Sequence, residues 1–362
     1  MPLDTPLLEL HRSSGATIGE YFGTRLPARF GEFTEEYAAL RRAVALVDTN
    51  YRAALSFAGP DRHRYLNALL TSNVRDLKAG QGTIGLLLNP QGHILAEVET
   101  FALESRILAI SHAMVNERTY ATFSKFIIMD DVEVEDVTSL TGTLDLAGPR
   151  CAKLLSELGV GNFADMPLLS HKEVKLGQFA CRIVRQEIAG EPAATLIVPR
   201  EYLVNLWREL SMRVRSVGGV PAGMEALNSV RLELGAPWFG IDYGDKQIPH
   251  EASLENTHIN YAKGCYTGQE IVERVRSRGH VNRRLTELQF SAAVAPPPGT
   301  NLLYEGNEAG SVTSTGYSPL LGRAVGLGYV RREHAALGTV LDAAGARAEV
   351  IAPPLLARKT PA

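Results

Sequence analysis

The sequence predicts an α+β protein in which two ferredoxin-like α+β subdomains precede a small β-barrel domain. The chain has 362 residues, more than one hydrophobic core usually serves, so more than one domain is expected. Segments with strand and helix patterns alternate in an order that occurs twice before residue 285. Beyond that point, short apolar runs between glycines and prolines replace the helical periodicity, which is typical of a β domain.

The composition excludes several classes of protein. Hydrophobic residues make up 45% of the chain, an ordinary share for a globular protein. With 37 basic and 40 acidic residues the net charge is −3, so nothing favours direct binding of nucleic acid. The N-terminus does not have the pattern of a signal peptide, and no run approaches the roughly 18 to 20 apolar residues of a membrane span. We therefore expect a cytoplasmic protein with no membrane partner.

The first elements follow from periodicity and turn chemistry. A helix is expected over residues 34–48, because acids in its first turn precede apolar residues at helical spacing. Residues 52–58 have the pattern of a strand, and the Gly-Pro turn after them leads to Asp61, which is expected to cap a helix. The order of strand, Ala-Gly-Pro and helix occurs again at residues 144–158. This repetition indicates two related subdomains, with chance recurrence of a common turn as the alternative.

The later elements complete both subdomains. A hairpin is expected around the turn at residues 89–92, and a further helix is expected to end at the stop signals Gly235 and Pro237. Strands are expected at residues 83–88, 93–103, 106–111, 179–187 and 194–198, and helices at 115–126, 201–212 and 226–234. We therefore expect a first region, 1–284, in which a subdomain of about 52–140 is inserted between 1–51 and 141–284. The barrel domain is expected at 285–362.

Of the three cysteines, Cys265 is the candidate for a reactive thiol. Three cysteines, Cys151, Cys181 and Cys265, are odd in number and far apart, so the sequence predicts neither a disulfide framework nor a metal site. Cys265 precedes Thr267 and Glu270, which have the spacing of a capping box at a helix start. A thiol near unpaired N–H donors, the helix dipole and a lysine is expected to have a lowered pKa. The alternative is a buried cysteine that only fills space.

The motif Lys-Gly-Cys-Tyr-Thr-Gly-Gln-Glu at residues 263–270, with Pro249 and Glu251 upstream, resembles the signature of the folate-binding YgfZ family. That family is a branch of the aminomethyltransferase (glycine cleavage T-protein) superfamily and is linked to iron-sulfur cluster assembly and repair. The resemblance implies two α+β subdomains and a barrel around a central folate channel. It implies tetrahydrofolate or another reduced folate as cofactor, iron-sulfur client or assembly proteins as partners, and Cys265 as the catalytic residue.

The same resemblance gives candidates for folate binding. Glu191 lies in a turn where aminomethyltransferases have a pterin-binding glutamate, and a carboxylate suits the N–H donors of a pterin edge. Arg231 matches a folate-facing arginine at a helix end, and we expect either Arg231 or Glu233 to point inward while the other is solvated. His112 lies where the transferases have a folate-contacting asparagine. Lys263 and Gln269 of the motif are further candidates for cofactor binding.

One departure from the transferase pattern bears on activity. Aminomethyltransferases have two aspartates after the hairpin turn, one of them near the reactive nitrogen of folate, and this chain has Ala96 and Glu97 there. Glu97 is the second catalytic candidate, with an ordinary exposed strand glutamate as the alternative. We therefore predict a tetrahydrofolate-binding accessory protein for iron-sulfur cluster assembly or repair that acts through Cys265. The alternatives are a tetrahydrofolate-dependent aminomethyltransferase or methyltransferase, and a cysteine hydrolase with a histidine base.

A run of basic residues follows the cysteine motif. The run lies within residues 274–284, and Glu270 and Glu273 come just before it. Its members are Arg274, Arg276, Arg278, His280, Arg283 and Arg284. Such a run suits a polyglutamate tail, a phosphate or an acidic partner protein. The alternative is the solvated face of a helix.

Overall fold

The computed structural model describes residues 1–188, 190–291 and 294–353. The chain divides into two compact units. Unit 1 comprises Met1–Leu86, Ala96–Leu227 and Asn260–Tyr266, and unit 2 comprises Leu87–Leu95, Asn228–Ile259 and Thr267–Ala362. No helix among the described residues is long and apolar enough to cross a membrane.

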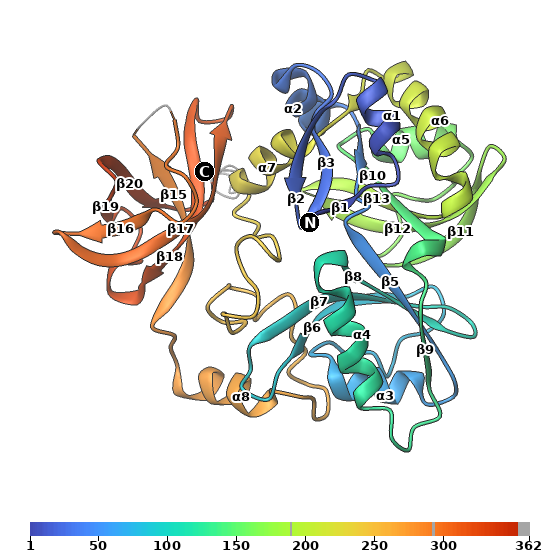
Figure 1. Ribbon diagram of the computed structural model, residues 1–362, viewed down its shortest axis with the longest axis horizontal. Coiled ribbons are helices and arrows are strands. Elements are labelled where there is room, and N and C mark those ends of the chain that lie inside the picture. The colour runs from blue at the N-terminus through green and yellow to red at the C-terminus, as the bar shows by residue number, and fades with distance from the viewer. Residues whose placement is uncertain (189, 292–293, 354–362) are drawn as a thin grey trace. The chain divides into compact units, whose positions relative to one another are not determined.

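A six-stranded sheet organises the larger half of unit 1, in the order β11-β12-β13-β10-β4-β14 (Figure 1). Its strands are β4 (Ala45–Asp48), β10 (Thr141–Ala147), β11 (His171–Leu176), β12 (Phe179–Ile188), β13 (Glu191–Pro199) and β14 (Val220–Pro221). The helices of this half are α1 (Leu8–Ser13), α2 (Phe33–Arg42), α5 (Cys151–Glu157) and α6 (Leu203–Ser216), with the short η3 (Arg200–Tyr202).

Helices α5 and α6 share one hydrophobic core with this sheet. Leu206 and Leu210 recur at helical spacing on α6 and are fully buried, together with Leu155 of α5. Leu146 of β10 and Leu196 of β13 belong to the same core. Because side chains alternate along a strand, the residues next to Leu146 and Leu196 in their own strands point to the opposite face of the sheet. That opposite face carries the polar cluster described below.

A five-stranded sheet forms the other half of unit 1, in the order β6-β7-β8-β5-β9. Its strands are β5 (Arg52–Ala58), β6 (Gly82–Leu88), β7 (Ile94–Ala102), β8 (Ile107–His112) and β9 (Glu133–Asp136), and its helices are α3 (Arg62–Leu69) and α4 (Asn116–Lys125), with η1 (Ala113–Val115) and η2 (Thr138–Leu140). Phe57 of β5 packs edge to face on Phe123 of α4, with their ring centres 5.1 Å apart. Tyr65, Leu66 and Leu69 of α3 are buried, so a helix does follow Asp61, but the Asp61 side chain does not cap it as predicted.

Two features of the N-terminal region differ from the sequence predictions. The helix expected over residues 34–48 ends at Arg42, because residues 45–48 form β4 and pair with both β10 and β14. The Leu-Val run there is buried by strand pairing, and this tertiary pairing outweighs the helical spacing of its apolar residues. A three-stranded sheet of β1 (Leu3–Asp4), β2 (Thr17–Tyr21) and β3 (Thr24–Arg29), in the order β1-β3-β2, lies in a region for which no strand was predicted.

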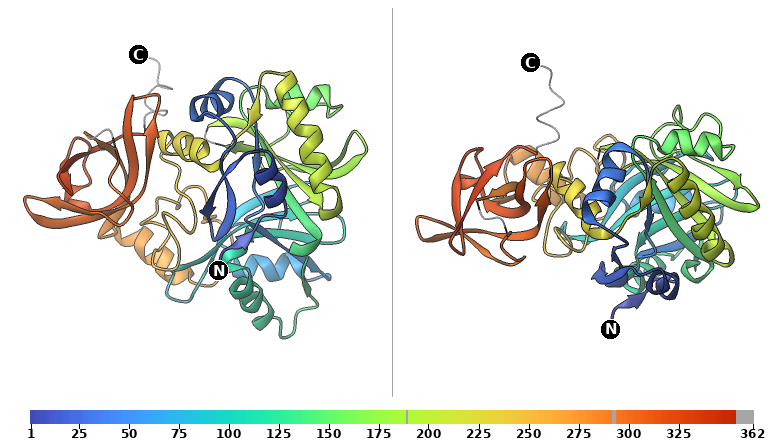
Figure 2. Two further views of the ribbon diagram at one scale, coloured as in Figure 1. Left: turned by 45° about the horizontal axis from the view of Figure 1, so that its top comes forward. Right: turned by 90° about the horizontal axis from the view of Figure 1, so that it is seen from above.

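Unit 2 contains the closed barrel β15-β18-β17-β16-β19-β20, which Figure 2 shows from two further directions. Its strands are β15 (Arg283–Phe290), β16 (Asn301–Tyr304), β17 (Asn307–Ser318), β18 (Arg323–Arg331), β19 (Val340–Ala343) and β20 (Ala346–Ile351). The short helix η4 (Arg332–His334) lies between β18 and β19. Helices α7 (Met224–Glu233) and α8 (Gln269–Arg278) precede the barrel in the chain. Leu288, Val312 and Val330 fill the barrel interior. On its outer face, Leu285 and Tyr329 pack with Leu232 of α7. The predicted α+β class and C-terminal barrel are confirmed, and the central folate channel stays a prediction.

Candidate functional site

Cys265 lies in an exposed loop, whereas the other two cysteines are buried. The ammonium group of Lys263 donates hydrogen bonds to the main-chain oxygens of Asn67 and Leu70, at the end of α3. Those carbonyls lack intrahelical donors and carry partial negative charge, so a cation there is stabilising. The same ammonium lies 5.0 Å from the centre of the buried Tyr266 ring. Lys263 and Tyr266 therefore hold the backbone on both sides of Cys265.

The electrostatic setting of Lys263 follows from this position. Burial, together with the nearby Arg75 guanidinium, lowers the pKa of Lys263 to about 8. The side chain is still mostly charged at neutral pH, and its donors are engaged with the carbonyls of α3. The structure thus gives Lys263 a role in holding the loop, which the sequence did not predict.

The helix after the motif begins later than the predicted capping box. Helix α8 starts at Gln269, its N-cap is Gly268 with φ of 82°, and no side chain caps it. Glu270 is exposed and pairs with Arg274 at 2.7 Å. A Cβ atom at position 268 would lie 2.7 Å from the main-chain oxygen of Asn89. The prediction of a Thr267 cap is therefore wrong. Gly268 adopts a left-handed conformation close to the backbone of Asn89, and the helix starts after it rather than at Thr267.

Unit 1 brings together five ionisable side chains that we name the Arg52 cluster: Arg52, Glu97, Glu99, His112 and Asp145. The guanidinium of Arg52 lies 3.0 Å from the Asp145 carboxylate. The Thr195 hydroxyl donates to the same carboxylate oxygen at 2.7 Å. Asp145 and Thr195 are cross-strand partners on β10 and β13, on the sheet face opposite the leucine core. Although burial opposes its charge, the Asp145 carboxylate raises the pKa of Arg52.

The imidazole of His112 is packed among aromatic rings. Its ring centre lies 5.2 Å from that of Phe22 and 5.1 Å from that of Tyr51. Phe22 has a positive φ of 54° in the turn between β2 and β3, a backbone conformation that residues other than glycine rarely adopt. Burial lowers the pKa of His112 to about 4, although the Glu97 carboxylate acts in the opposite direction. His112 is therefore neutral at neutral pH.

Burial also acts on Glu99 of the Arg52 cluster and on the neighbouring Tyr51. Burial raises the pKa of Glu99, against the effect of Arg52 and of a 2.7 Å hydrogen bond from the Gln186 amide. Burial raises the pKa of Tyr51 to about 12. The cluster thus offers a partly buried carboxyl group at Glu97, a neutral imidazole at His112 and a buried acid at Glu99 whose pKa is raised. These groups suit proton transfer to or from a ligand nitrogen.

Glu191 lies at the start of β13, where its carboxylate pairs with the Arg41 guanidinium at 2.9 Å. Both side chains are about one-fifth exposed. A carboxylate held in this way still reaches solvent. Glu191 is therefore accessible to a ligand that carries N–H donors.

Arg231 and Glu233 are both buried, so the prediction that one of them is solvated is wrong. Arg231 pairs with Asp242 at 2.6 Å, and its guanidinium lies 4.5 Å from the centre of the Trp238 ring. Glu233 accepts hydrogen bonds from the Ser318 hydroxyl at 2.6 Å and from the Leu320 amide at 3.1 Å. The two side chains do leave α7 in different directions, but each meets its own set of partners within unit 2.

The family profiles that match this chain cover most of its length. Residues 7–260 match the GCVT N-terminal domain, and residues 283–356 match the glycine cleavage T-protein C-terminal barrel domain. The chain belongs to the glycine cleavage T-protein superfamily.

Curated relatives in this superfamily are named aminomethyltransferases. The protein from Rubrobacter xylanophilus is 28% identical over 329 residues, which cover 91% of this chain and 87% of the relative. The protein from Nostoc sp. is 28% identical over 345 residues, covering 93% and 90% respectively. The crystal structure of glycine cleavage system aminomethyltransferase T from Bartonella henselae is 24% identical, covers 98% of both chains and has a TM-score of 0.85, which supports the shared fold.

Membership of the T-protein superfamily leaves the narrower YgfZ assignment a prediction. Ala96, where the T-protein pattern has an aspartate, is fully buried in β7, and Glu97 beside it is partly buried. A methyl group in place of a carboxylate removes one proton acceptor from this strand. Glu97 and its neighbours in the Arg52 cluster are then the ionisable groups available at this place in the T-protein fold.

Several residues of the T-protein candidate site escaped the sequence analysis. Tyr51, Arg52, Glu99 and Asp145 were not singled out, and neither was Phe22. A signal was present for two of them, because Arg52 and Asp145 are charged residues at or within otherwise apolar strands. The aromatic packing of His112 had no such signal, because Phe22, Tyr51 and His112 come from separate elements.

One buried side-chain donor in unit 2 bears on the predicted folate contact of Arg231. The Nη2 atom of Arg231 is buried and has no hydrogen-bond partner among the described residues. A buried donor of this kind costs about 1–3 kcal/mol when it stays unsatisfied, so a ligand oxygen or a water is expected to accept from it. Arg231 therefore stays a candidate for folate binding in this T-protein relative.

Proposed function

We propose that this chain binds a reduced folate and catalyses one-carbon transfer of the aminomethyltransferase kind. The observation that carries the proposal is the Arg52 cluster, in which a carboxylate and a neutral imidazole lie together in a chain of the T-protein superfamily. A bound folate would supply the nitrogen that exchanges the one-carbon group. Glu97 would hold or move a proton at that nitrogen, and His112 would accept or donate a hydrogen bond beside it.

The other candidates would hold and orient the ligand. Within unit 1, Glu191 would accept hydrogen bonds from the pterin edge. Arg231, in unit 2, stays a separate candidate for folate contact. Glu99 would accept the hydrogen bond from the Gln186 amide and so hold its place in the Arg52 cluster. Lys263 and Gln269 stay candidates for cofactor contact.

Calorimetric titration with tetrahydrofolate tests the binding step. Glu191→Ala is expected to weaken binding at least about tenfold, because charge-assisted hydrogen bonds to the ligand are lost. Glu173→Ala is the matched control, since Glu173 also pairs with an arginine, Arg182, on the same six-stranded sheet. Absence of saturable binding by the wild type, or equal weakening by both variants, would refute the proposed folate site.

Turnover of an aminomethyl donor in the presence of tetrahydrofolate tests the chemical step. Glu97→Gln is expected to keep folate affinity within about threefold and to lower the rate roughly 10²- to 10⁴-fold, the usual contribution of a general acid or base. Glu133→Gln, an exposed acid on β9, serves as the control. Undiminished turnover by Glu97→Gln would remove Glu97 from the mechanism, and no turnover by the wild type would refute the transferase proposal.

A second proposal, that of the YgfZ type, rests on a different observation. Cys265 is exposed, lies in the Lys-Gly-Cys-Tyr-Thr-Gly-Gln-Glu motif, and is held from both sides by Lys263 and Tyr266. In this proposal the chain binds folate and supports iron-sulfur cluster assembly or repair on partner proteins through the thiol. Cys265→Ser would then abolish support of an iron-sulfur enzyme and leave folate affinity unchanged. Unimpaired support by that variant would exclude this second function.

A further inference from the structure

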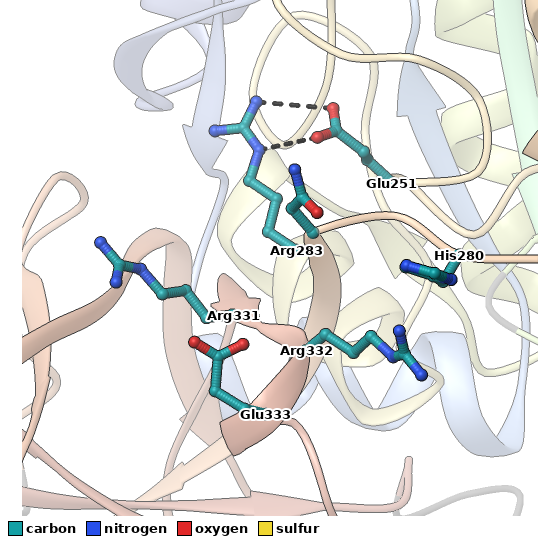
Figure 3. A pocket seen from close by; sticks show the side chains of 7 residues that line it. Glu251, His280, Arg283, Arg331, Arg332 and Glu333 are labelled. Carbon is teal, nitrogen blue, oxygen red and sulfur yellow. Dashed lines mark hydrogen bonds and ion pairs between the residues drawn. The ribbon is translucent and has the colours of Figure 1, made fainter.

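Unit 2 contains a pocket that none of the functions above uses. It has a volume of about 580 Å³ and lies where the chain from α8 enters β15, beside the end of β18 (Figure 3). Seven residues line it, and all of them are polar or charged. Such a lining favours a polar or charged ligand.

Main-chain hydrogen bonds fix the walls of this pocket. Arg283 of β15 and Arg331 of β18 are paired across the barrel strands. The amide of Arg332 donates to the main-chain oxygen of Asn282 at 2.9 Å, and the loop that carries Glu251 accepts a 2.8 Å hydrogen bond from the Leu285 amide. The lining side chains therefore extend from backbone that is already in place.

Arg283 has its charge balanced within the pocket. Its Nε atom lies 3.0 Å from one oxygen of Glu251, and its Nη2 atom lies 3.5 Å from the other. The guanidinium also lies 5.0 Å from the centre of the Tyr329 ring. Figure 3 shows this ion pair on one wall of the pocket. Arg283 and Glu251 thus form a rigid, neutral part of the lining.

Arg331 and Arg332 have no such counter-ion. Both side chains are exposed, and neither makes an ion pair or hydrogen bond with any residue that the structure describes. In Figure 3 their guanidinium groups point to opposite sides of the strand end, and Arg332 extends toward the side on which His280 lies. Three arginines against Glu251 and Glu333 leave the pocket with a net positive charge.

We propose that this pocket binds a small polyanion with at least two separated carboxylate or phosphate groups. A guanidinium fork suits both kinds of anion, and two forks that point apart cannot both hold one compact anion. One anionic group would bind Arg331, and the other would bind Arg332 beside His280. The volume of about 580 Å³ exceeds the needs of a single phosphate and lies within the range of small-molecule sites. The proposal does not depend on folate binding or on the Arg52 cluster.

Titration calorimetry at low salt tests the site with citrate, inorganic pyrophosphate and inorganic phosphate as probes. Tighter binding of citrate would indicate a carboxylate ligand, and tighter binding of pyrophosphate would indicate a phosphate ligand. The double variant Arg331→Ala/Arg332→Ala is expected to weaken binding of the preferred probe at least about tenfold. Arg323→Ala/Arg347→Ala removes two exposed arginines from the same barrel outside the pocket and is expected to change affinity less than about threefold, through long-range charge alone.

The outcomes separate the parts of the proposal. Saturable binding of citrate or pyrophosphate at one site per chain, lost in the pocket variant and kept in the control, would support it. Binding of neither probe, or equal loss in both double variants, would overturn it. Inorganic phosphate is expected to bind at least about tenfold more weakly than the preferred probe, and equal affinity would overturn the requirement for two anionic groups.

Discussion

At the scale of single residues, the three cysteines show how burial divides one residue type into different chemical roles. Cys151 and Cys181 lie in the core beneath the six-stranded sheet, and burial raises the pKa of each thiol to about 12. Cys265 is exposed in a loop that Lys263 anchors. Since the thiolate is the reactive form, the two buried thiols are doubly protected, by low access and by protonation.

We predict that a disulfide reagent such as dithionitrobenzoate labels one thiol of the native protein rapidly at pH 8. The other two are expected to react at least about a hundredfold more slowly, until the protein is unfolded. Absorbance at the thiolate product measures both phases. Cys265→Ser should lose the rapid phase, and Cys181→Ala should keep it. A rapid phase that survives in Cys265→Ser would show that a buried cysteine is accessible.

At the scale of elements, the repeated order of strand, Gly-Pro turn and helix depends on close backbone approach. Gly148, between β10 and α5, has φ of 130°. A Cβ atom there would lie 2.6 Å from the main-chain oxygen of Ala43 and 3.1 Å from that of Ala39. The turn therefore packs directly on the last turn of α2, and only glycine fits it without displacement.

We predict that Gly148→Ala lowers the free energy of unfolding by roughly 1–3 kcal/mol, through both the strained φ and the clash with backbone. The urea midpoint measures the effect. Gly161→Ala is the control, because a Cβ at that position would have no heavy atom within 4 Å. Equal midpoints for Gly148→Ala and the wild type would contradict the close approach.

At the scale of the whole molecule, one buried acid links stability to pH. Glu287 lies on β15, and neither of its carboxylate oxygens has a hydrogen-bond partner among the described residues. Burial raises the pKa of Glu287 well above 4.5, although the Arg231 guanidinium acts to lower it. The folded state thus favours the protonated acid. Its contribution to stability is fully present below about pH 4.5 and is lost as the pH rises through the folded-state pKa.

We predict that Glu287→Gln is more stable than the wild type at pH 8 by roughly 1–3 kcal/mol, because glutamine has no charge to bury. The difference is expected to vanish as the pH falls toward 4.5. Urea midpoints between pH 4.5 and pH 8 follow it. Glu308→Gln, at an exposed position on β17, should reproduce the wild-type profile. A difference that is independent of pH would show that Glu287 is not the titrating group.

Much of the architecture could be predicted from local signals. The strand at residues 52–58, the turn at Asn89 and the barrel were all expected from alternation and turn residues, and the structure confirms them. The errors fall where a distant partner decides. Residues 45–47 are apolar in a pattern that suits helix or strand, and pairing with β10 and β14 makes residues 45–48 a strand. At Thr267 a local capping pattern is outweighed by the conformation of Gly268.

The sequence by itself determined most of the order of elements from residue 52 onward and the change from α+β to barrel. Periodicity and turn chemistry act over a few residues, so they can be read along the chain. Tertiary structure decided the site. The Arg52 cluster joins strands up to 93 positions apart, and the partners of Arg231 and the pocket beside Arg331 likewise come from separate elements. Burial and pKa depend on those distant neighbours, and no local pattern encodes them.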